Sequence, residues 1–367
     1  MNSFWELETF YRKRDFIIIG AGFSGLWTAI SLKEKFPEKS ILVIERNSVP
    51  IGASTRNAGF ACFGSLTEIL SDADKMGWQK TLDLVKMRFE GLQKIQKYFK
   101  PEDIDFERVG GYEILNNAEP LERLVEVNEK LKSITGLEKT FFLCQEKTVE
   151  FGLKNTTFLV ENPCEGSLHP GKLVHKLLHK CQNLGIEFLF GTSVLEIFEN
   201  EKEVKINTKN FQIKAEKLVI ATNAFAKDLI KNLDLTPVRG QILLTKPIKD
   251  LKLKGTYHYD EGYIYFRNVG NIVLLGGARN LDFKTEETTE FEITEFLQNY
   301  LEKFLAEVIL HKQSFEISSR WTGIMAVGKE KSPIVKQISN RQFCAVRLSG
   351  MGVALAPKLG EQIAEMI

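Results

Sequence analysis

The stretch DFIIIGAGFSGLWTAI, residues 15–30, joins a short apolar run to three closely spaced glycines. Phe16–Ile19 is rich in β-branched residues, which is typical of a strand buried on both faces. Gly20–Gly25 matches the pattern G-x-G-x-x-G, and a helical run follows it. These glycines interrupt the apolar run, so a signal peptide is a poor interpretation. The stretch instead predicts a strand, a tight turn and a helix whose N-terminus faces the phosphates of a dinucleotide.

A second strand supports this interpretation. Ile41–Ile44 is apolar and is followed by Glu45, which comes 20 positions after Gly25. An acidic side chain at this spacing can accept hydrogen bonds from ribose hydroxyls, and it disfavours the 2′-phosphate of NADP. FAD and NAD both fit such a turn, so this pattern alone does not choose between them.

Composition limits the function classes further. A chain of 367 residues with 43% hydrophobic residues can bury the cores of two domains. The net charge of +1 gives no broad field for binding nucleic acid, and no apolar run is long enough for an integral membrane segment. Five scattered cysteines without a C-x-x-C pair favour a reducing compartment over a disulfide framework. We therefore expect a cytoplasmic protein.

The stretch VPIGASTRNAGFACFGS, residues 49–65, is rich in small residues that suit a chain passing close to a large flat ligand. Here the sequence resembles the FAD-dependent oxidoreductase family of D-amino-acid oxidase, glycine oxidase and sarcosine oxidase. GASTRNAGF is similar to the family loop beside the pyrophosphate and flavin. Six further motifs follow in family order: HPGKLVHKLLHKCQNLGIEFLFGTSVLEI from residue 169, KLVIATNAFA from 217, TPVRGQ from 236, IVLLGGARN from 272, RWTGIMAVGKEKSPIV from 320 and LSGMGVALAPKLGEQIA from 348.

The resemblance implies an α/β fold with a Rossmann-like FAD-binding domain of the glutathione-reductase type and a second, α+β substrate domain. We expect the FAD-binding domain to comprise residues 1–75, 150–225 and 320–367, and the substrate domain to comprise residues 76–149 and 226–319. Alternation in YHYDEGYIYFRNVGNIVLLGG, residues 257–277, predicts antiparallel strands for the substrate domain. One face of that sheet is expected to overlie the flavin.

The glycine pattern and the resemblance together predict the cofactor contacts. A glycine loop ahead of the last helix, Gly350–Gly352, could offer backbone N–H groups to the negative charge of a reduced flavin. The full set of expected cofactor-binding residues is Gly20, Ala21, Gly22, Phe23, Ser24, Gly25, Glu45, Arg46, Ala53, Ser54, Thr55, Arg56, Asn57, Ala58, Gly59, Phe60, Ala61, Val194, Ala221, Thr222, Asn223, Gln241, Gly323, Gly350, Met351, Gly352 and Val353.

Candidate substrate contacts come from the second domain. Arg279 follows a Gly-Gly turn and could hold a substrate carboxylate through a bidentate pair, and Arg267 competes for that role. Tyr263 and Tyr265 share a face by strand alternation and could add a polar wall. Each of these could instead be a packing residue or part of a surface ion pair. Met351 completes the candidate catalytic set.

Two departures from the sarcosine-oxidase pattern bear on mechanism. That subgroup attaches its flavin through a cysteine after the Arg-Trp-Gly motif, where this chain has Met325–Val327, so we expect non-covalent FAD. The same subgroup places a lysine over the flavin that assists reaction with oxygen. The matching position here is Leu274, which predicts slow use of oxygen. No metal site is expected, since His175 and His179 lack a third ligand.

Three functions are compatible with the sequence. The first is an oxidoreductase that transfers a hydride from the carbon beside an amine, in a small amino acid or amine, to flavin N5. The second is a 2-hydroxy acid dehydrogenase that passes electrons to a carrier or quinone. The third is a flavin-binding subunit without turnover. The expected partners are a small-molecule substrate and, as acceptor, oxygen or an electron carrier.

Overall fold

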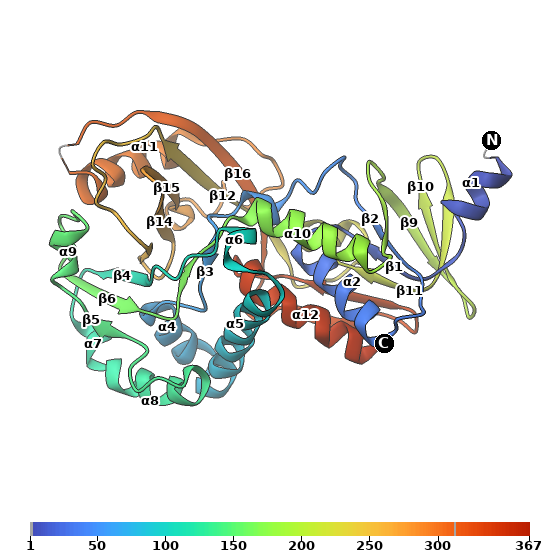
Figure 1. The fold of residues 1–367 in the computed structure, drawn as a ribbon, viewed down its shortest axis with the longest axis horizontal. Helices are drawn as coiled ribbons and strands as arrows, with labels where there is room; N and C mark the ends of the chain where they lie inside the picture. Colours follow the sequence, from blue (N-terminus) through green and yellow to red (C-terminus); the bar gives the residue numbers. More distant parts are fainter. Residues whose placement is uncertain (1–2, 312) are drawn as a thin grey trace. The chain divides into compact units, whose positions relative to one another are not determined.

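The computed structural model describes residues 3–311 and 313–367 (Figure 1). The chain divides into two compact units. Unit 1 consists of Met1–Thr55, Gly171–Pro237 and Met325–Ile367, and unit 2 consists of Arg56–Pro170 and Val238–Ile324. The predicted α/β class, with a Rossmann-like part and an antiparallel second sheet, is confirmed.

Unit 1 is built on a largely parallel sheet. Ile17 and Ile18 in its central strand are fully buried, as expected for an apolar run with sheet neighbours on both edges and cover on both faces. The strand order is β17 (Ile334–Gln337), β18 (Gln342–Val346), β11 (Gln212–Ile220), β1 (Arg14–Ile19), β2 (Ile41–Ile44) and β8 (Glu187–Leu189). Two antiparallel strands, β9 (Val194–Glu199) and β10 (Val204–Thr208), extend from β11.

Helices α2 (Phe23–Lys35) and α12 (Gly352–Met366) pack against each other in unit 1 (Figure 1). Their contact is so close that a Cβ added at Gly360 would lie 2.6 Å from the backbone of Trp27. The N-terminal sequence motif and the last helix of the chain are thereby joined in one layer. The other helices that begin or lie in this part of the chain are α1 (Phe4–Thr9), α3 (Ala53–Arg56), η1 (Asn223–Asp228) and α10 (Pro170–Asn183).

Unit 2 is built on a second sheet. The order is β16 (Ile317–Val327), β12 (Thr236–Thr245), β15 (Ile272–Gly277), β14 (Ile264–Val269), β13 (Thr256–Tyr259), β4 (Gly111–Leu115), β6 (Phe158–Asn162) and β5 (Phe142–Leu143). In this order, neighbouring strands pair antiparallel from β12 to β13 and from β4 to β5, whereas β13 and β4 are parallel. A small separate pair joins β3 (Phe60–Ala61) to β7 (Gly166–Ser167).

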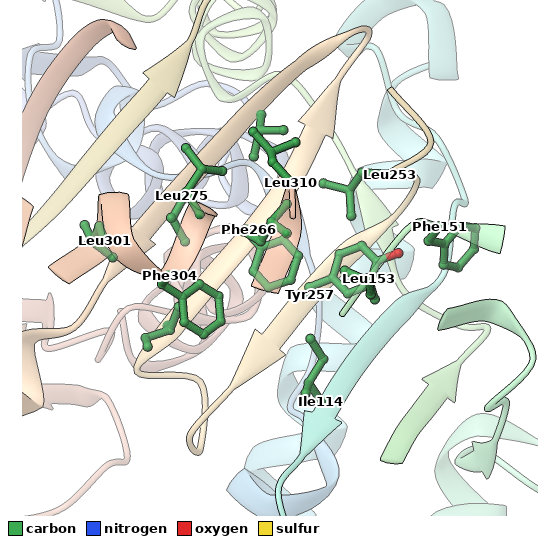
Figure 2. Close-up of a cluster of buried hydrophobic side chains, with 14 of the residues drawn as sticks. Ile114, Phe151, Leu153, Leu253, Tyr257, Phe266, Leu275, Leu301, Phe304 and Leu310 are labelled. Atoms are coloured by element: carbon green, nitrogen blue, oxygen red, sulfur yellow. The ribbon is translucent and has the colours of Figure 1, made fainter. Parts of the chain in front are cut away.

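One face of this sheet forms the main core of unit 2 (Figure 2). Tyr257 and Phe266 stack with ring centroids 4.6 Å apart, and Leu275 and Phe304 pack with them. Because successive residues of a strand point to opposite faces, the residues between these lie on the other face. The helices of unit 2 are α4 (Leu66–Met76), α5 (Trp78–Tyr98), α6 (Pro101–Ile104), α7 (Glu119–Glu122), α8 (Leu124–Thr135), α9 (Lys147–Glu150), η2 (Arg279–Leu281), α11 (Glu295–Phe304) and η3 (Leu305–Ile309).

The unit boundaries differ from those expected from sequence. Residues 56–75, 150–170 and 320–324 lie in unit 2 rather than with the dinucleotide fold, and residues 226–237 lie in unit 1. The pairing of β3 with β7 joins the segment 56–75 to the segment 150–170 within unit 2. These contacts join residues about 100 positions apart, which short-range patterns do not reveal.

Two further observations concern compartment and membrane. All five cysteines are free thiols in the structure. None of the helices in the described ranges has the length and apolar character that crossing a bilayer requires.

Candidate functional site

The glycine turn of unit 1 lies at the carboxyl ends of the parallel strands. Gly20 has a φ of +105°, and a Cβ there would lie 2.8 Å from the carbonyl oxygen of Ala221. A Cβ at Gly25 would lie 1.8 Å from the carbonyl oxygen of Gly20, so no side chain fits there. Strand β1 separates β2 from β11, which makes this turn the switch point where doubly wound folds bind their ligands.

Glu45 stands beside this turn, as the sequence predicted. Its Oε2 accepts a hydrogen bond from the backbone N of Ala21 (3.0 Å), and its Oε1 accepts from the N of Asn47 (3.1 Å). The carboxylate is buried, and these donors fix its direction at the end of β2. The guanidinium carbon of Arg46 lies 3.9 Å from the centroid of the Phe225 ring.

Two hydroxyls near the strand ends are buried without a partner. The Oγ1 of Thr222 and the Oγ of Ser349 make no hydrogen bond within the described part of the chain. Thr222 adjoins the glycine turn, since its backbone N would lie 3.5 Å from a Cβ at Gly20. Buried polar groups are normally satisfied, so an unmet hydroxyl at a ligand-binding edge fits a polar ligand.

The loop before α12 contains the expected N–H donors. The N–H of Met351 donates to the carbonyl of Leu348 (2.8 Å). Helix α12 begins at Gly352, and no side chain in the described part of the protein caps its N-terminus. The free N–H groups at this helix end therefore start at Gly352, and a cofactor contact of Met351 stays a prediction.

Arg347 holds this loop in place, and sequence reasoning missed it. It has a φ of +61° and is buried. Its guanidinium donates to both the backbone and the carboxylate of Asp234 and to the carbonyl of Ser332. Its own N–H donates to Oδ1 of Asn223 (3.0 Å), which fixes the predicted contact residue Asn223 from behind. No local motif marks Arg347, because its partners lie far away in the chain.

In unit 2, the predicted flavin loop lies against the second face of the sheet. Trp321 Nε1 donates to the carbonyl of Arg56 (3.0 Å), and Arg56 donates to the carbonyl of Thr322 (2.8 Å). The Phe60 ring lies 5.3 Å from the ring of His258 and 6.0 Å from that of Tyr265. Ala58, Ile242 and Leu274 form a small apolar cluster on this face, with Phe60, Leu244, Tyr265 and Trp321 around it.

Arg279 lies at the end of β15, close to this face. Its guanidinium carbon is 4.9 Å from the centroid of the Phe283 ring and 5.8 Å from that of Tyr263. It forms no ion pair within residues 3–311 and 313–367, and burial lowers its pKa. Its charge also acts on Tyr265, whose pKa burial nevertheless raises to about 12. A half-buried arginine with aromatic walls and no acidic partner is well suited to bind a carboxylate.

Arg267 and Gln241 make contacts that support the fold. Arg267 NH1 donates to the carbonyls of Gly59 (2.9 Å) and Leu168 (3.1 Å), so it fastens the predicted flavin loop to the sheet. These contacts favour Arg279 over Arg267 as the carboxylate-binding candidate. Gln241 is fully buried, and its side-chain amide bonds Glu286, Thr294 and Gln298 on the opposite side of β12 from the apolar cluster. Its contact with a cofactor stays a prediction.

For the remaining predicted cofactor-binding residues, contact with a cofactor stays a prediction. The segment 53–61 contains the one-turn helix α3 and the two-residue strand β3. Ser54 Oγ accepts from the N of Phe23 (2.9 Å) beside Gly22. A Cβ at Gly323 would lie 3.2 Å from the Cβ of Arg56, and Val194 begins β9.

Unit 2 also contains a cluster of buried titratable side chains, Glu113, Glu165 and His258. Glu165 Oε1 accepts from the backbone N of Phe63 (2.9 Å), while its Oε2 lies 3.9 Å from Nε2 of His258. Burial raises the pKa of Glu165 to about 8 and that of Glu113 to about 7, and it lowers the pKa of His258 to about 4. The sequence did not predict this cluster, because its residues come from parts of the chain that are far apart.

We expect the variant Glu165→Gln to be more stable than the wild type at about pH 8, by roughly 4 kcal/mol. The pKa of Glu165 rises from 4.5 when exposed to about 8 in the fold, so between these values the folded state holds more protons. Stability from this group is complete below pH 4.5 and is lost as the pH rises through 8. Glutamine mimics the protonated acid at every pH.

The measurement is chemical denaturation at several pH values. The two proteins should have similar free energies of unfolding near pH 5 and should diverge toward pH 8. Exposed Glu102→Gln is the matched control and should not change the pH profile. A constant difference between wild type and Glu165→Gln across this range would contradict the assignment.

A glycine turn at the switch point of a parallel sheet, followed by an acid at the end of the next strand, is typical of dinucleotide-binding enzymes. The family model for FAD dependent oxidoreductases (DAO) matches residues 15–366, so this chain belongs to that family.

Individual relatives share about a quarter of their residues with the chain. The probable oxidoreductase OrdL of Haemophilus influenzae is 24% identical over 362 residues, which cover 96% of this chain and 82% of the relative. The glycine oxidase of Bacillus licheniformis is 24% identical over 97% of this chain and 94% of its own length. The structure of L-proline dehydrogenase from P. horikoshii has a TM-score of 0.81 and 20% identity, covering 97% of this chain and 93% of that one.

The cofactor of this oxidoreductase is FAD, bound non-covalently. The structure fits that cofactor: the glycine turn admits no Cβ, Thr222 and Ser349 offer unmet hydroxyls, and the end of α12 is uncapped. No cysteine stands at Met325–Val327. Cys344 is buried in β18, and burial raises the pKa of its thiol to about 11, so it is not a reactive thiolate.

Proposed function

We propose that this chain oxidises the C–N bond of a small amino acid whose carboxylate is bound by Arg279. The observation that carries the proposal is the unpaired, half-buried guanidinium of Arg279 beside the second face of the unit 2 sheet. A planar arginine fork matches a carboxylate in a bidentate pair. When bound, FAD accepts the hydride at N5 of its flavin ring.

The residues around Arg279 favour an amine over an alcohol as the oxidised group. An alcohol needs a base to take its proton during hydride loss, whereas an amine loses a proton to water near neutral pH more readily. Tyr265 stays protonated with a pKa of about 12, and His258 with a pKa of about 4 is a weak base. Leu274 and Ile242 keep this face apolar. The product is an imine, which water hydrolyses to a carbonyl compound and ammonia.

Leu274 also bears on the electron acceptor. It is buried among Ala58 and Ile242, and no cation takes its place in that cluster. A positive charge at this position is what assists the oxygen reaction in the sarcosine-oxidase subgroup. We therefore propose an electron carrier rather than oxygen as the principal acceptor, and a cytoplasmic location where such carriers are available.

The test is turnover with an artificial electron-accepting dye and a panel of amino acids, simple amines and 2-hydroxy acids. We expect dye reduction and ammonia release in equal amounts with at least one amino acid. Turnover of a 2-hydroxy acid without ammonia would establish the dehydrogenase alternative. Absence of turnover with the whole panel, in a protein that carries FAD, would support a flavin-binding subunit and contradict the proposal.

A further inference from the structure

Glu286 anchors the loop that carries Arg279. After Arg279 the chain turns through Asp282, whose N–H donates to the carbonyl of Arg279 (3.1 Å), and the N–H of Glu286 donates to the carbonyl of Asp282 (3.1 Å). Glu286 is fully buried. Its carbonyl accepts from the backbone N of Arg239 (2.7 Å), which fixes the loop to β12.

The carboxylate of Glu286 is committed to this anchor. Arg239 Nε donates to its Oε2 (2.9 Å), and Arg239 NH2 donates to its Oε1 (2.8 Å), which is a bidentate pair. Gln241 Nε2 (2.9 Å) and Thr294 Oγ1 (3.1 Å) also donate to Oε1. Every member except Thr294 is nine-tenths buried or more, so the pair is held away from solvent.

Glu286 is also close enough to Arg279 to affect it electrostatically. Its charge raises the pKa of Arg279 against the larger lowering by burial. A free carboxylate in the same short loop would be a natural partner for that guanidinium. Yet Arg279 has no ion pair in the described ranges, and both oxygens of Glu286 accept hydrogen bonds from other residues.

We propose that Arg239 is a positioning residue that reserves Arg279 for the substrate: by holding Glu286 in a bidentate pair, it prevents Glu286 from occupying Arg279. The inference rests on the proposed function, in which Arg279 binds a carboxylate. It explains why a buried ion pair stands beside a site that needs an unpaired cation. A buried ion pair of this kind fixes the positions of its residues and adds little net stability to the fold.

The test uses 3-phenylpropionate as a probe carboxylate and 3-phenylpropionamide as its uncharged match, with binding to FAD-loaded protein measured by calorimetry. In Arg239→Met, Glu286 is released and competes for Arg279. We expect the Kd for phenylpropionate to rise by about tenfold or more, while the Kd for the amide changes by less than about threefold.

Rescue separates positioning from a merely structural role. The double variant Arg239→Met with Glu286→Gln has no carboxylate to compete, so the Kd for phenylpropionate should return to within about threefold of the wild-type value. Arg239→Lys keeps a positive charge beside Glu286 and should stay near wild type, which guards against misfolding of the methionine variant. A double variant that binds no better than Arg239→Met alone would overturn the proposal.

A crystal structure of Arg239→Met gives an answer that needs no ligand. We expect an ion pair between Glu286 and Arg279, and a Glu286 carboxylate that stays away from Arg279 would overturn the proposal. The Arg279→Met variant reports on the proposed function separately. If it binds phenylpropionate as well as the wild type does, or if the wild type binds none, carboxylate binding by Arg279 is wrong, whatever the crystal structure shows of Glu286.

Discussion

Replacing Gly25 by alanine should abolish FAD binding. A Cβ at this position would lie 1.8 Å from the carbonyl oxygen of Gly20 and 3.4 Å from the side chain of Ile18. Because the first obstacle is backbone, no rotamer change relieves it, and α2 must move away from β1. We expect either loss of the folded protein or a weakening of FAD binding by more than about 100-fold, since overpacking against backbone costs several kcal/mol.

The control for this variant is Glu38→Ala. Glu38 lies in the same unit, is exposed, and follows the end of α2. This protein should purify with the same FAD content and the same thermal midpoint as the wild type. Titration of the apoproteins with FAD, followed by the quenching of flavin fluorescence, measures the FAD affinity of both variants. Thermal unfolding measures the midpoint. A Gly25→Ala protein that binds FAD like the wild type would contradict the assignment of the glycine turn as the FAD-binding site.

Replacing Arg279 by methionine should remove recognition of the substrate carboxylate. Methionine keeps much of the side-chain volume against Tyr263 and Phe283 but has no charge and no hydrogen-bond donor. A charge-assisted bidentate pair is worth about 1.5–3 kcal/mol, so kcat/KM for an amino acid should fall by roughly 10- to 100-fold. This fall should come mainly from a higher KM, with little change in kcat, because the carboxylate does not react.

The comparison with a decarboxylated substrate isolates this effect. For the amine that corresponds to the best amino acid, kcat/KM should be nearly equal in wild type and Arg279→Met. Lys284→Met removes a charge from an exposed position of the same loop and should leave both substrates unaffected. Equal losses for the amino acid and the amine would show that Arg279 supports the fold rather than the carboxylate.

Much of the fold could be predicted from the sequence, because the decisive signals are local. The run Phe16–Ile19, the glycines after it and Glu45 lie within about thirty residues, and each has a direct steric or electrostatic reason. Alternation in residues 257–277 likewise predicted β13, β14 and β15. The division into compact units differs from the predicted domain boundaries, since it depends on contacts such as the pairing of β3 with β7 across a long intervening segment.

The candidate site was predicted unevenly for the same reason. Arg279 and Arg267 look equivalent in sequence, and only the tertiary contacts of Arg267 with Gly59 and Leu168 separate them. Gln241 is predicted as a cofactor contact, and its side-chain hydrogen bonds on the face opposite the apolar cluster become visible only in the folded protein. The partners of Arg347 and Glu286 are distant along the chain or unmarked by any motif, so no sequence signal identifies their roles.

The most direct test of the account is the visible spectrum of the purified, FAD-loaded protein during anaerobic addition of amino acids. The account predicts an oxidised flavin spectrum that bleaches fully with at least one amino acid and recovers only slowly when air is admitted, because Leu274 offers no charge to assist oxygen. A flavin spectrum that no amino acid or amine bleaches, or a protein that takes up no FAD, would contradict it.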